Sequence, residues 1–312
     1  MKGERPKDLP RSVRERLVAL SHQRGEDPNL VLTRYAAERL LYRLSRSAHR
    51  SAFILKGAML FLTWGGYPHR PTRDVDLLGF GGLSLARLRE IMAEICLTPV
   101  EDDGLRFDPE TIRVEEIRER DDYGGLRVRL VAMLGTSRLS VQVDVGIGDL
   151  VVPVPTEIEF PTLLPFPAPR VRAYGREAVI AEKLHAMVAL GLVNSRMKDF
   201  FDLWTIATSC TVDGTVLRDA IAATFPVRRT GIPREEPVAF TEAFATAAEK
   251  TAQWSAFLDR DGLPDHGTGL VGVVAAIRRF LLKPLKAARD GEPFEMVWAP
   301  GGPWMPARGQ RG

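Results

Sequence analysis

The chain has 312 residues, of which 45% are hydrophobic and 27% charged, and its formal net charge is +3. This composition indicates a globular protein that buries a core in one large or two ordinary domains, and it excludes a chain too polar to fold. Because no run of about 18 apolar residues occurs and residues 1–30 lack the apolar core of a secretory signal, we expect a cytoplasmic protein with no membrane partner.

The chain is expected to open with helices and to continue into short strands. Apolar residues recur at helical spacing through residues 1–50, and the apolar runs that follow are short and bounded by turn residues. The expected elements are helices over 10–25, 28–48 and 85–96, a helical turn over 58–64, and strands over 52–56 and 74–78. We expect residues 1–50 to pack as helices on the domain that follows.

A mixed sheet is predicted next, because three strands separated by turn residues fall between residues 105 and 147. Six prolines then occur between residues 153 and 169. Proline can neither donate to a central strand nor continue a helix, so we interpret this segment as the connection between two domains. Residues 51–170 are the first of these domains.

The second half of the chain has helical periodicity almost throughout. Helices are expected over 178–190, 198–209, 215–225, 238–258 and 269–288. Residues 171–290 therefore form a predicted helical domain, and residues 291–312, rich in Gly and Pro, are expected to be a flexible tail.

The candidate chemistry lies on two predicted strands. Side chains alternate along a strand, so Thr72, Asp74 and Asp76 project from one face, and the two carboxylates repel each other unless a cation lies between them. In "SVQVDVG" the valines alternate toward the core, which puts Gln142 and Asp144 on the accessible face. Three carboxylates from two strands are able to hold two metal ions for phosphoryl or nucleotidyl transfer, although a solvated strand edge would also explain Asp-Val-Asp.

Other polar residues have both a functional and an ordinary interpretation. Gly57, at a strand-to-helix junction, lets the backbone approach a phosphate closely, or it is a simple turn. Lys183 lies on the polar side of an amphipathic helix, and Asp199 and Asp202 share a face near the start of the next helix. Surface exposure and interaction with the helix dipole would explain these residues equally well.

Taken in chain order, "LKGAMLFLTW", "RPTRDVDL", "VQVDVG", "YGREAVIAEKLHAM" and "NSRMKDFFDLW" resemble the AbiEii/AbiGii-type (MenT-like) toxin nucleotidyltransferases. The resemblance covers residues 53–207. It implies an α+β protein, with a polymerase-β-like nucleotidyltransferase mixed sheet and flanking helices followed by a helical C-terminal domain that closes the cleft. It also implies a toxin of a toxin-antitoxin system, with a cognate antitoxin protein as its partner.

The resemblance implies an enzyme that transfers a nucleoside monophosphate from an NTP to RNA, with the 3′ end of tRNA as the expected acceptor, and so blocks translation. Asp74, Asp76 and Asp144 match the family's metal-binding carboxylates for Mg²⁺ or Mn²⁺. Lys183 matches the residue that neutralises the triphosphate. The remaining positions expected at the site are Lys198 and Asp199 from the second domain, and Lys56, Gly57 and Thr72 at the nucleotide.

Three questions stay open at the level of the sequence. Asp199 could act as a base, in the outer shell of a metal, or as an ion-pair partner that orients Lys183 or Lys198. Ala58-Met59 follows Gly57 where many members carry a second Gly and then Ser or Thr, so a hydroxyl expected near the phosphates is missing. The acceptor could instead be a protein hydroxyl or a small molecule, and an inactive binding module with this fold is a further alternative.

Overall fold

The computed structural model describes residues 8–65, 70–117, 124–148, 151–265 and 267–307. The chain divides into two compact units, which are described separately. The first consists of Met1–Asp149 with Thr156–Ala173, and the second of Leu150–Pro155 with Tyr174–Gly312. Among the described helices, none combines the length and the apolar composition that crossing a bilayer requires.

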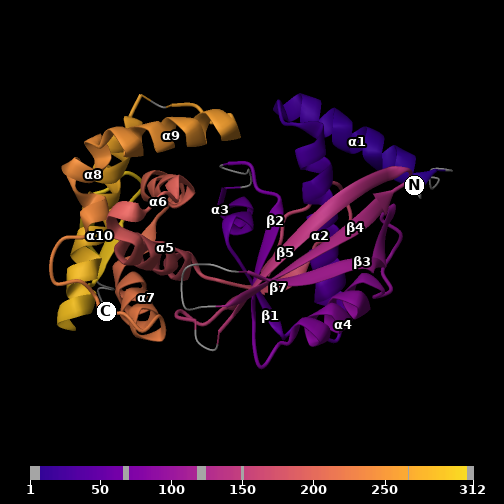
Figure 1. The fold of residues 1–312 in the computed structure, drawn as a ribbon, viewed down its shortest axis with the longest axis horizontal. Helices are drawn as coiled ribbons and strands as arrows, with labels where there is room; N and C mark the ends of the chain where they lie inside the picture. Colours follow the sequence, from indigo (N-terminus) through magenta and orange to yellow (C-terminus); the bar gives the residue numbers. More distant parts are fainter. Residues whose placement is uncertain (1–7, 66–69, 118–123, 149–150, 266, 308–312) are drawn as a thin grey trace. The chain divides into compact units, whose positions relative to one another are not determined.

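The described part of the first unit contains four helices and the strands that carry Asp74, Asp76 and Asp144 (Figure 1). Its helices are α1 (Leu9–Arg24), α2 (Pro28–Arg46), α3 (Phe61–Gly65) and α4 (Leu85–Cys96), with the 3₁₀ turn η1 (Ala58–Leu60). Its strands are β1 (Phe53–Lys56), β2 (Asp74–Gly79), β3 (Leu105–Ile117), β4 (Gly125–Leu134), β5 (Ser137–Ile147), β6 (Thr156–Glu159) and β7 (Arg170–Ala173).

The seven strands form one mixed sheet in the order β3-β4-β5-β2-β1-β7-β6. Strand β2 runs parallel to β5 and β1 parallel to β7, whereas the other neighbouring pairs are antiparallel. Val141, Val143 and Val145 of β5 are buried, as the alternation in the sequence predicts. The mixed sheet with flanking helices confirms the predicted α+β class.

Helix α2 begins at a capped N-terminus. Its first turn begins at Pro28 and is capped by Asp27, whose side chain accepts hydrogen bonds from the backbone N–H groups of Asn29 (2.6 Å) and Leu30 (3.1 Å). An Asp cap followed by proline is a strong helix start, because the carboxylate satisfies orphan N–H groups and proline needs none. The local sequence therefore fixes where α2 begins.

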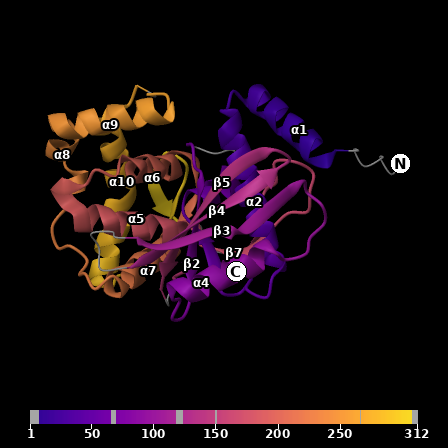
Figure 2. The same ribbon diagram turned by 45° about the vertical axis from the view of Figure 1, so that its right-hand side comes forward.

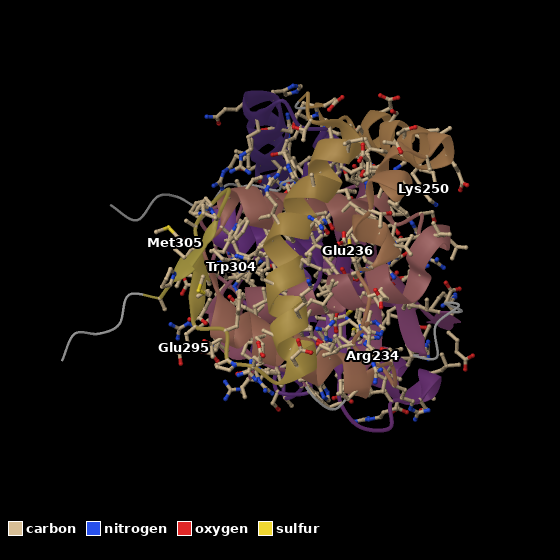
Figure 3. The ribbon with its side chains drawn as sticks, turned by 90° about the vertical axis from the view of Figure 1, so that its left-hand side faces the viewer. Arg234, Glu236, Lys250, Glu295, Trp304 and Met305 are labelled. Atoms are coloured by element: carbon tan, nitrogen blue, oxygen red, sulfur yellow. The ribbon has the colours of Figure 1, made fainter. Side chains whose placement is uncertain are left out.

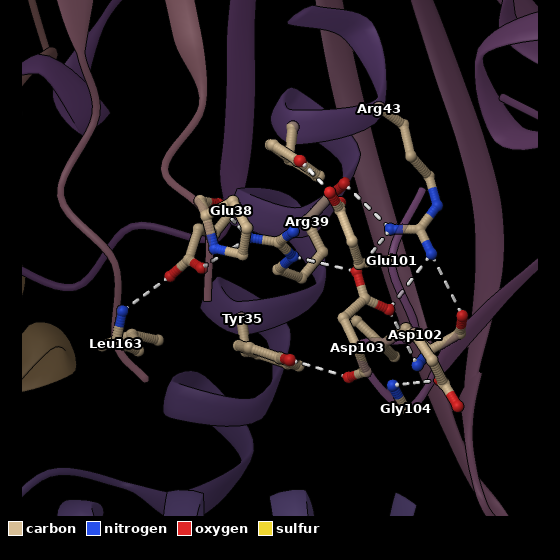
Figure 4. A network of polar contacts seen from close by, with 12 residues as sticks. Tyr35, Glu38, Arg39, Arg43, Glu101, Asp102, Asp103, Gly104 and Leu163 are labelled. Atoms are coloured by element: carbon tan, nitrogen blue, oxygen red, sulfur yellow. Dashed lines mark hydrogen bonds and ion pairs between the residues drawn. The ribbon is translucent and has the colours of Figure 1, made fainter. Parts of the chain in front are cut away.

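A buried polar network ties α2 to the segment before β3 (Figure 4). Arg39 donates to Asp103 at 2.9 Å, and Arg43 donates to both oxygens of Asp103 at 2.8 and 3.1 Å. Burial opposes ionisation of Asp103, but the hydrogen bonds and charges of the two arginines outweigh it, so the pKa of Asp103 is lowered. Burial raises the pKa of the neighbouring Glu38 to about 7, although its carboxylate accepts a hydrogen bond from the backbone N–H of Leu163.

The second unit is mainly helical, as expected. It contains α5 (Arg176–Leu190), α6 (Met197–Ser209), α7 (Gly214–Val227), α8 (Glu242–Thr246), α9 (Ala248–Asp261) and α10 (Gly269–Asp290), with the 3₁₀ turns η2 (Gly191–Val193) and η3 (Val238–Phe240). The single helix expected over 238–258 is wrong, because the extended backbone of Ala247 (φ −59°, ψ 129°) separates α8 from α9.

The tail expected over 291–312 is also wrong for its described part. Residues 296–306 form the hairpin of β9 (Met296–Trp298) and β10 (Trp304–Pro306), and β9 also pairs with β8 (Val212–Asp213). Trp298 and Trp304 are buried, and the indole N–H of Trp304 donates to the carbonyl of Phe280 in α10. Figure 3 shows Trp304 beside α10 and Met305 pointing away from it. The two tryptophans bury enough apolar surface to hold the hairpin in place, which a composition rich in Gly and Pro did not indicate.

The proline-rich segment holds more structure than a simple connection. Strands β6 and β7 flank the prolines at 161–169 and pair with each other, and β6 forms an edge of the seven-stranded sheet. Both strands are free of proline, and an edge strand tolerates proline beside it. Within residues 153–169 the strand present is β6, at the edge of the sheet, and β7, which lies between β1 and β6, begins only at Arg170.

Candidate active site

Four charged residues lie directly opposite one another on four neighbouring strands of the first unit. Lys56 of β1 pairs with Asp76 of β2, Asp76 pairs with Asp144 of β5, and Asp144 pairs with Arg127 of β4. Residues that pair across a sheet project from the same face. Lys56, Asp76, Asp144 and Arg127 therefore form a charged row, with two carboxylates at its centre and a cation at each end.

The third predicted carboxylate, Asp74, lies on the same strand and face as Asp76. It pairs with Gln142 of β5, one step along the sheet from the charged row. Asp74 and Asp76 are both partly exposed, while Val75 between them is buried. The register thus places on one face of the sheet the three acidic side chains that the sequence singled out. Thr72 is partly exposed and precedes β2 without belonging to it.

Arg127 forms a bidentate ion pair with the carboxylate of Asp144. Its Nε lies 2.8 Å from Oδ1 and its Nη2 lies 2.7 Å from Oδ2. The pKa of Arg127 is raised, first by the hydrogen bonds to Asp144 and further by the charges of Asp144 and Asp74. Asp144 is thus a carboxylate whose two oxygens are already satisfied by a guanidinium.

Gly57 is required where β1 ends, beside the carboxylate of Asp76. Its backbone has φ 74° and ψ −160°, a region that is almost exclusive to glycine. A Cβ added to Gly57 would lie 2.6 Å from Cγ of Asp76, so glycine also leaves room for this carboxylate. The elements that follow, η1 and α3, are too short to provide a substantial helix dipole, and the close approach is what the structure supports.

Lys56 reaches along the same face toward β5. A Cβ added to Gly146 would lie 3.5 Å from the Nζ of Lys56, so the amine lies against the backbone of β5 two residues beyond Asp144. Two positive groups, Lys56 and Arg127, therefore flank the central carboxylates from opposite sides.

Asp74, Asp76 and Asp144 differ in how well each would serve as a ligand of a divalent cation. Among the described residues, no group of three Asp, Glu, His or Cys side chains is arranged to hold a metal ion. Asp74 and Asp76 fit Mg²⁺, which commonly takes one or two carboxylates together with substrate phosphates. Each oxygen of Asp144 already accepts a hydrogen bond from Arg127, so a cation would have to share this carboxylate with the guanidinium or replace it.

In the second unit, Lys183 is held by two buried aspartates. Its Nζ in α5 lies 2.6 Å from Oδ1 of Asp199 and 2.7 Å from Oδ2 of Asp202, both in α6. The side chains of Asp199 and Asp202 are 2% and 0% exposed, so these charges depend on their partners. Arg196 adds a second cation at 2.8 Å from Asp199.

The burial of Asp199 and its ion pairs determine whether its carboxylate is charged and whether it is able to accept a proton. Burial opposes its ionisation, but the charges of Lys183 and then Arg196 outweigh burial and lower the pKa of Asp199. A carboxylate with a lowered pKa that is paired with two cations is a poor proton acceptor. Lys198, expected to act beside Asp199, is exposed on the first turn of α6, and the cations paired with Asp199 are Lys183 and Arg196.

The sequence interpretation missed Arg127, Arg196 and the pairing of Asp202. A signal for Arg127 was present, because Gly135-Thr136 forms a two-residue hairpin turn that pairs Leu134 with Ser137. Counting back from that turn places Arg127 opposite Asp144. Arg196 precedes its partner Asp199 by three residues, so the spacing along the chain was a signal for that pair. For Asp202 the pairing with Lys183 depends on how α5 packs beside α6, which spacing along the chain does not reveal.

Comparisons with known proteins found a matching family model and similar solved structures. The family model described as "Nucleotidyl transferase AbiEii toxin, Type IV TA system" matches residues 39–281. Among solved structures, MenT4, a nucleotidyltransferase toxin from Mycobacterium tuberculosis H37Rv, is 19% identical and has a TM-score of 0.50, with 88% of this chain and 99% of that chain covered. JHP933 from Helicobacter pylori is 13% identical with a TM-score of 0.44, covering 83% of this chain and 91% of that chain.

The likeness to MenT4 shows a shared fold. No curated protein matches the sequence.

Proposed function

The chain belongs to the AbiEii nucleotidyltransferase toxin family of type IV toxin-antitoxin systems, and we propose that it transfers NMP from an NTP, with Mg²⁺, to the 3′ end of tRNA. The family membership confirms the resemblance drawn from the sequence motifs and makes the protein a nucleotidyltransferase with an antitoxin as its partner. Both proposed substrates are found in the cytoplasm, where the reaction would take place.

The observation that carries this proposal is the charged row. Asp76 and Asp144 lie directly opposite each other, and like charges in that position destabilise a sheet unless a cation offsets them. Arg127 performs that role for Asp144 in this structure. Asp74 and Asp76 would hold the divalent cation, which supplies neutralisation of the charge on the transferring phosphate.

The other residues of the row have roles that follow from their charge and shape. Lys56 and Arg127 would neutralise phosphate oxygens on either side of the carboxylates, and a guanidinium that releases Asp144 would be able to bind a phosphate with two hydrogen bonds. Gly57 keeps the backbone beside Asp76 open for close approach of the nucleotide. Thr72 supplies a hydroxyl just before β2, and it is the candidate to contact the nucleotide where Ala58 offers no hydroxyl.

For the second unit we assign a fixed positive charge to Lys183. Two short ion pairs restrict the ammonium group to one position, so little rotamer freedom remains to be lost when it meets a triphosphate. Asp199 and Asp202 would act as positioning residues. Of the three roles open for Asp199, its burial and its two cationic partners support the ion-pair role. Lys198 remains a candidate for contact with the nucleotide from the exposed side of α6.

A labelling experiment tests the proposal. The protein would be incubated with total tRNA, Mg²⁺ and each labelled NTP in turn, beside the variants Asp76→Asn and Asp102→Asn. Asp102 lies in an exposed loop of the same unit and makes a matched control. We expect label on tRNA for the wild type and for Asp102→Asn, and none for Asp76→Asn with its melting temperature unchanged or raised, because a like-charge contact is removed.

The outcomes separate the alternatives. Label that appears on protein or on a small alcohol would replace the RNA acceptor by another one. A wild type that labels no RNA with any nucleotide would remove the RNA proposal, and full activity of Asp76→Asn would remove the proposed metal site.

A further inference from the structure

The face of the sheet that carries the charged row continues past the row onto a surface rich in arginine. Strand β5 pairs with β2 only from Gln142 to Ile147. The earlier residues of β5 extend beyond β2 and pair with β4, which in turn pairs with β3. Figure 2 shows β3, β4 and β5 as neighbouring long strands. The residues of these strands that share the face of Asp144 are fixed by the pairing register.

Five arginines lie on that face, which we call the arginine face. They are Arg106 and Arg113 of β3, Arg127 and Arg129 of β4, and Arg138 of β5. Arg106, Arg113, Arg129 and Arg138 are exposed. Every basic residue at these paired positions of the three described strands is arginine and none is lysine. Arginine presents a planar fork that matches phosphate with two hydrogen bonds, so this composition favours a phosphate-bearing partner.

Acidic residues on the same face neutralise the arginines only in part. Asp144 is paired with Arg127, and Glu115 is paired with Arg129 at 2.6 Å. The remaining carboxylate, Asp108, accepts a hydrogen bond from the backbone N–H of Glu110. Three arginines, Arg106, Arg113 and Arg138, thus exceed the acidic partners that the register provides.

The register also places two of the arginines directly opposite each other on neighbouring strands. Arg113 of β3 is the cross-strand partner of Arg129 of β4. Like charges in that position cost stability, just as the opposed pair Asp76 and Asp144 does. Glu115 offsets the charge of Arg129, and Nη1 of Arg113 donates to the carbonyls of Glu110 and Ile112. A guanidinium has five N–H donors, so each of the two arginines keeps donors that phosphate oxygens can accept. The two pairs lie on one continuous face of one sheet.

We propose that the arginine face binds the sugar-phosphate backbone of the acceptor RNA, just upstream of the 3′ end. This inference rests on the proposed transfer to RNA. Arg138 is six residues from Asp144 along β5, which is about 20 Å of extended strand. With an axial rise of about 3.4 Å per stacked nucleotide, the face accommodates about six nucleotides between the charged row and Arg138.

The test compares two triple variants of the full-length protein. Arg106→Gln with Arg113→Gln and Arg138→Gln removes charge from the arginine face. Arg14→Gln with Arg16→Gln and Arg89→Gln removes the same charge from exposed positions of α1 and α4. Fluorescence anisotropy with a labelled single-stranded RNA of about 16 nucleotides measures affinity across a salt series, and thermal unfolding confirms that both variants fold.

We expect the arginine-face variant to lose affinity about fivefold per lost contact, or about a hundredfold in total at about 0.1 M salt. Its slope of log K against log salt should fall by about 2. In the labelling assay the KM for tRNA should rise while the KM for NTP stays unchanged. A triple Arg→Lys variant at the same positions should keep most of the salt slope, because the charge is retained.

The two proposals fail in distinguishable ways. If tRNA is labelled with an unchanged KM by the arginine-face variant, the surface assignment is overturned and the proposed function stands. If RNA binding depends on the arginine face while the wild type labels no RNA, the surface stands and the transfer to RNA falls. If the variant loses only its affinity for the antitoxin, the face belongs to that protein partner and the RNA assignment is overturned.

Discussion

Replacing Gly57 by alanine adds one methyl group at the point where β1 ends beside Asp76. Two costs follow from the structure. The backbone at φ 74° and ψ −160° strains any residue other than glycine by about 1–3 kcal/mol. The new methyl group would also lie 2.6 Å from Cγ of Asp76, so the carboxylate has to rotate or β2 has to shift. We therefore expect Gly57→Ala to lower the free energy of unfolding by about 1–3 kcal/mol.

The displacement of Asp76 should reduce activity more than the loss of stability does. A shift of about 1 Å in a reacting group commonly costs about a hundredfold in rate, and we expect at least that loss in kcat for NMP transfer. Chemical denaturation and the labelling assay with tRNA measure the two effects on the same preparation. At assay temperature the folded fraction should stay near its wild-type value, so the rate loss reports on geometry.

Gly82→Ala is the matched control, because no atom lies within 4 Å of a Cβ at Gly82 and its φ is not in the left-handed region. It should leave activity unchanged and stability unchanged or raised by about 0.4–1 kcal/mol. Combining Gly57→Ala with Asp76→Ala should restore part of the lost stability, since the contact with the carboxylate disappears and only backbone strain remains. A Gly57→Ala protein with wild-type stability and rate would refute the reasoning.

Three further outcomes are expected. Lys183→Ala should lower the free energy of unfolding by about 3–5 kcal/mol because it leaves two buried carboxylates without their shared cation, whereas exposed Lys198→Ala should change it by less than about 0.5 kcal/mol in urea titrations. The pKa of Glu38 is about 7 in the folded chain against 4.5 ordinarily. The folded state therefore holds a proton that the unfolded state releases, and stability declines as pH rises between these values. Glu38→Gln should abolish that decline, worth at most about 3 kcal/mol, in unfolding curves at about pH 5 and about pH 8. Arg127→Gln should lose about 1–3 kcal/mol without metal, by thermal unfolding, and Mg²⁺ should stabilise this variant more than the wild type, because Asp144 is then open to the cation. An equal response to Mg²⁺ in both proteins would argue against Asp144 as a ligand.

The sequence predicted the acidic side chains of the site because their placement depends on local rules. Alternation along a strand was sufficient to put Asp74 and Asp76 on one face and Asp144 on the accessible face of β5. The direct opposition of Asp76 and Asp144 required knowledge that β2 and β5 pair in parallel, although the two residues are 68 positions apart in the chain. No local pattern specifies a parallel register of that kind.

The prediction of a flexible tail over 291–312 was wrong for the described residues because two tryptophans in that segment are buried. The segment after 291 is rich in Gly and Pro, and these residues favoured a flexible tail. Two tryptophans nevertheless hold it in place, with the indole of Trp298 donating to the carbonyl of Ala207 at 2.7 Å. Aromatic anchors of this kind act through tertiary packing, and propensity counted along the chain does not register them.

A substitution that abolishes activity is evidence of different things at Asp74 and Asp76 and at Lys183 with its two aspartates. Asp74 and Asp76 are partly exposed and repel each other, so removing one charge should cost activity and little stability. Lys183 and its aspartates are buried and mutually dependent, so removing one partner damages the fold of the second unit whether or not the lysine meets a triphosphate. Loss of activity on its own is therefore evidence of a catalytic role for Asp76 but not for Lys183. For Lys183 the informative variant is Lys183→Arg, which keeps the charge between the aspartates while moving the donors. A folded Lys183→Arg protein with a raised KM for NTP would support contact with the nucleotide, and one with unchanged kinetics would leave Lys183 a purely structural charge.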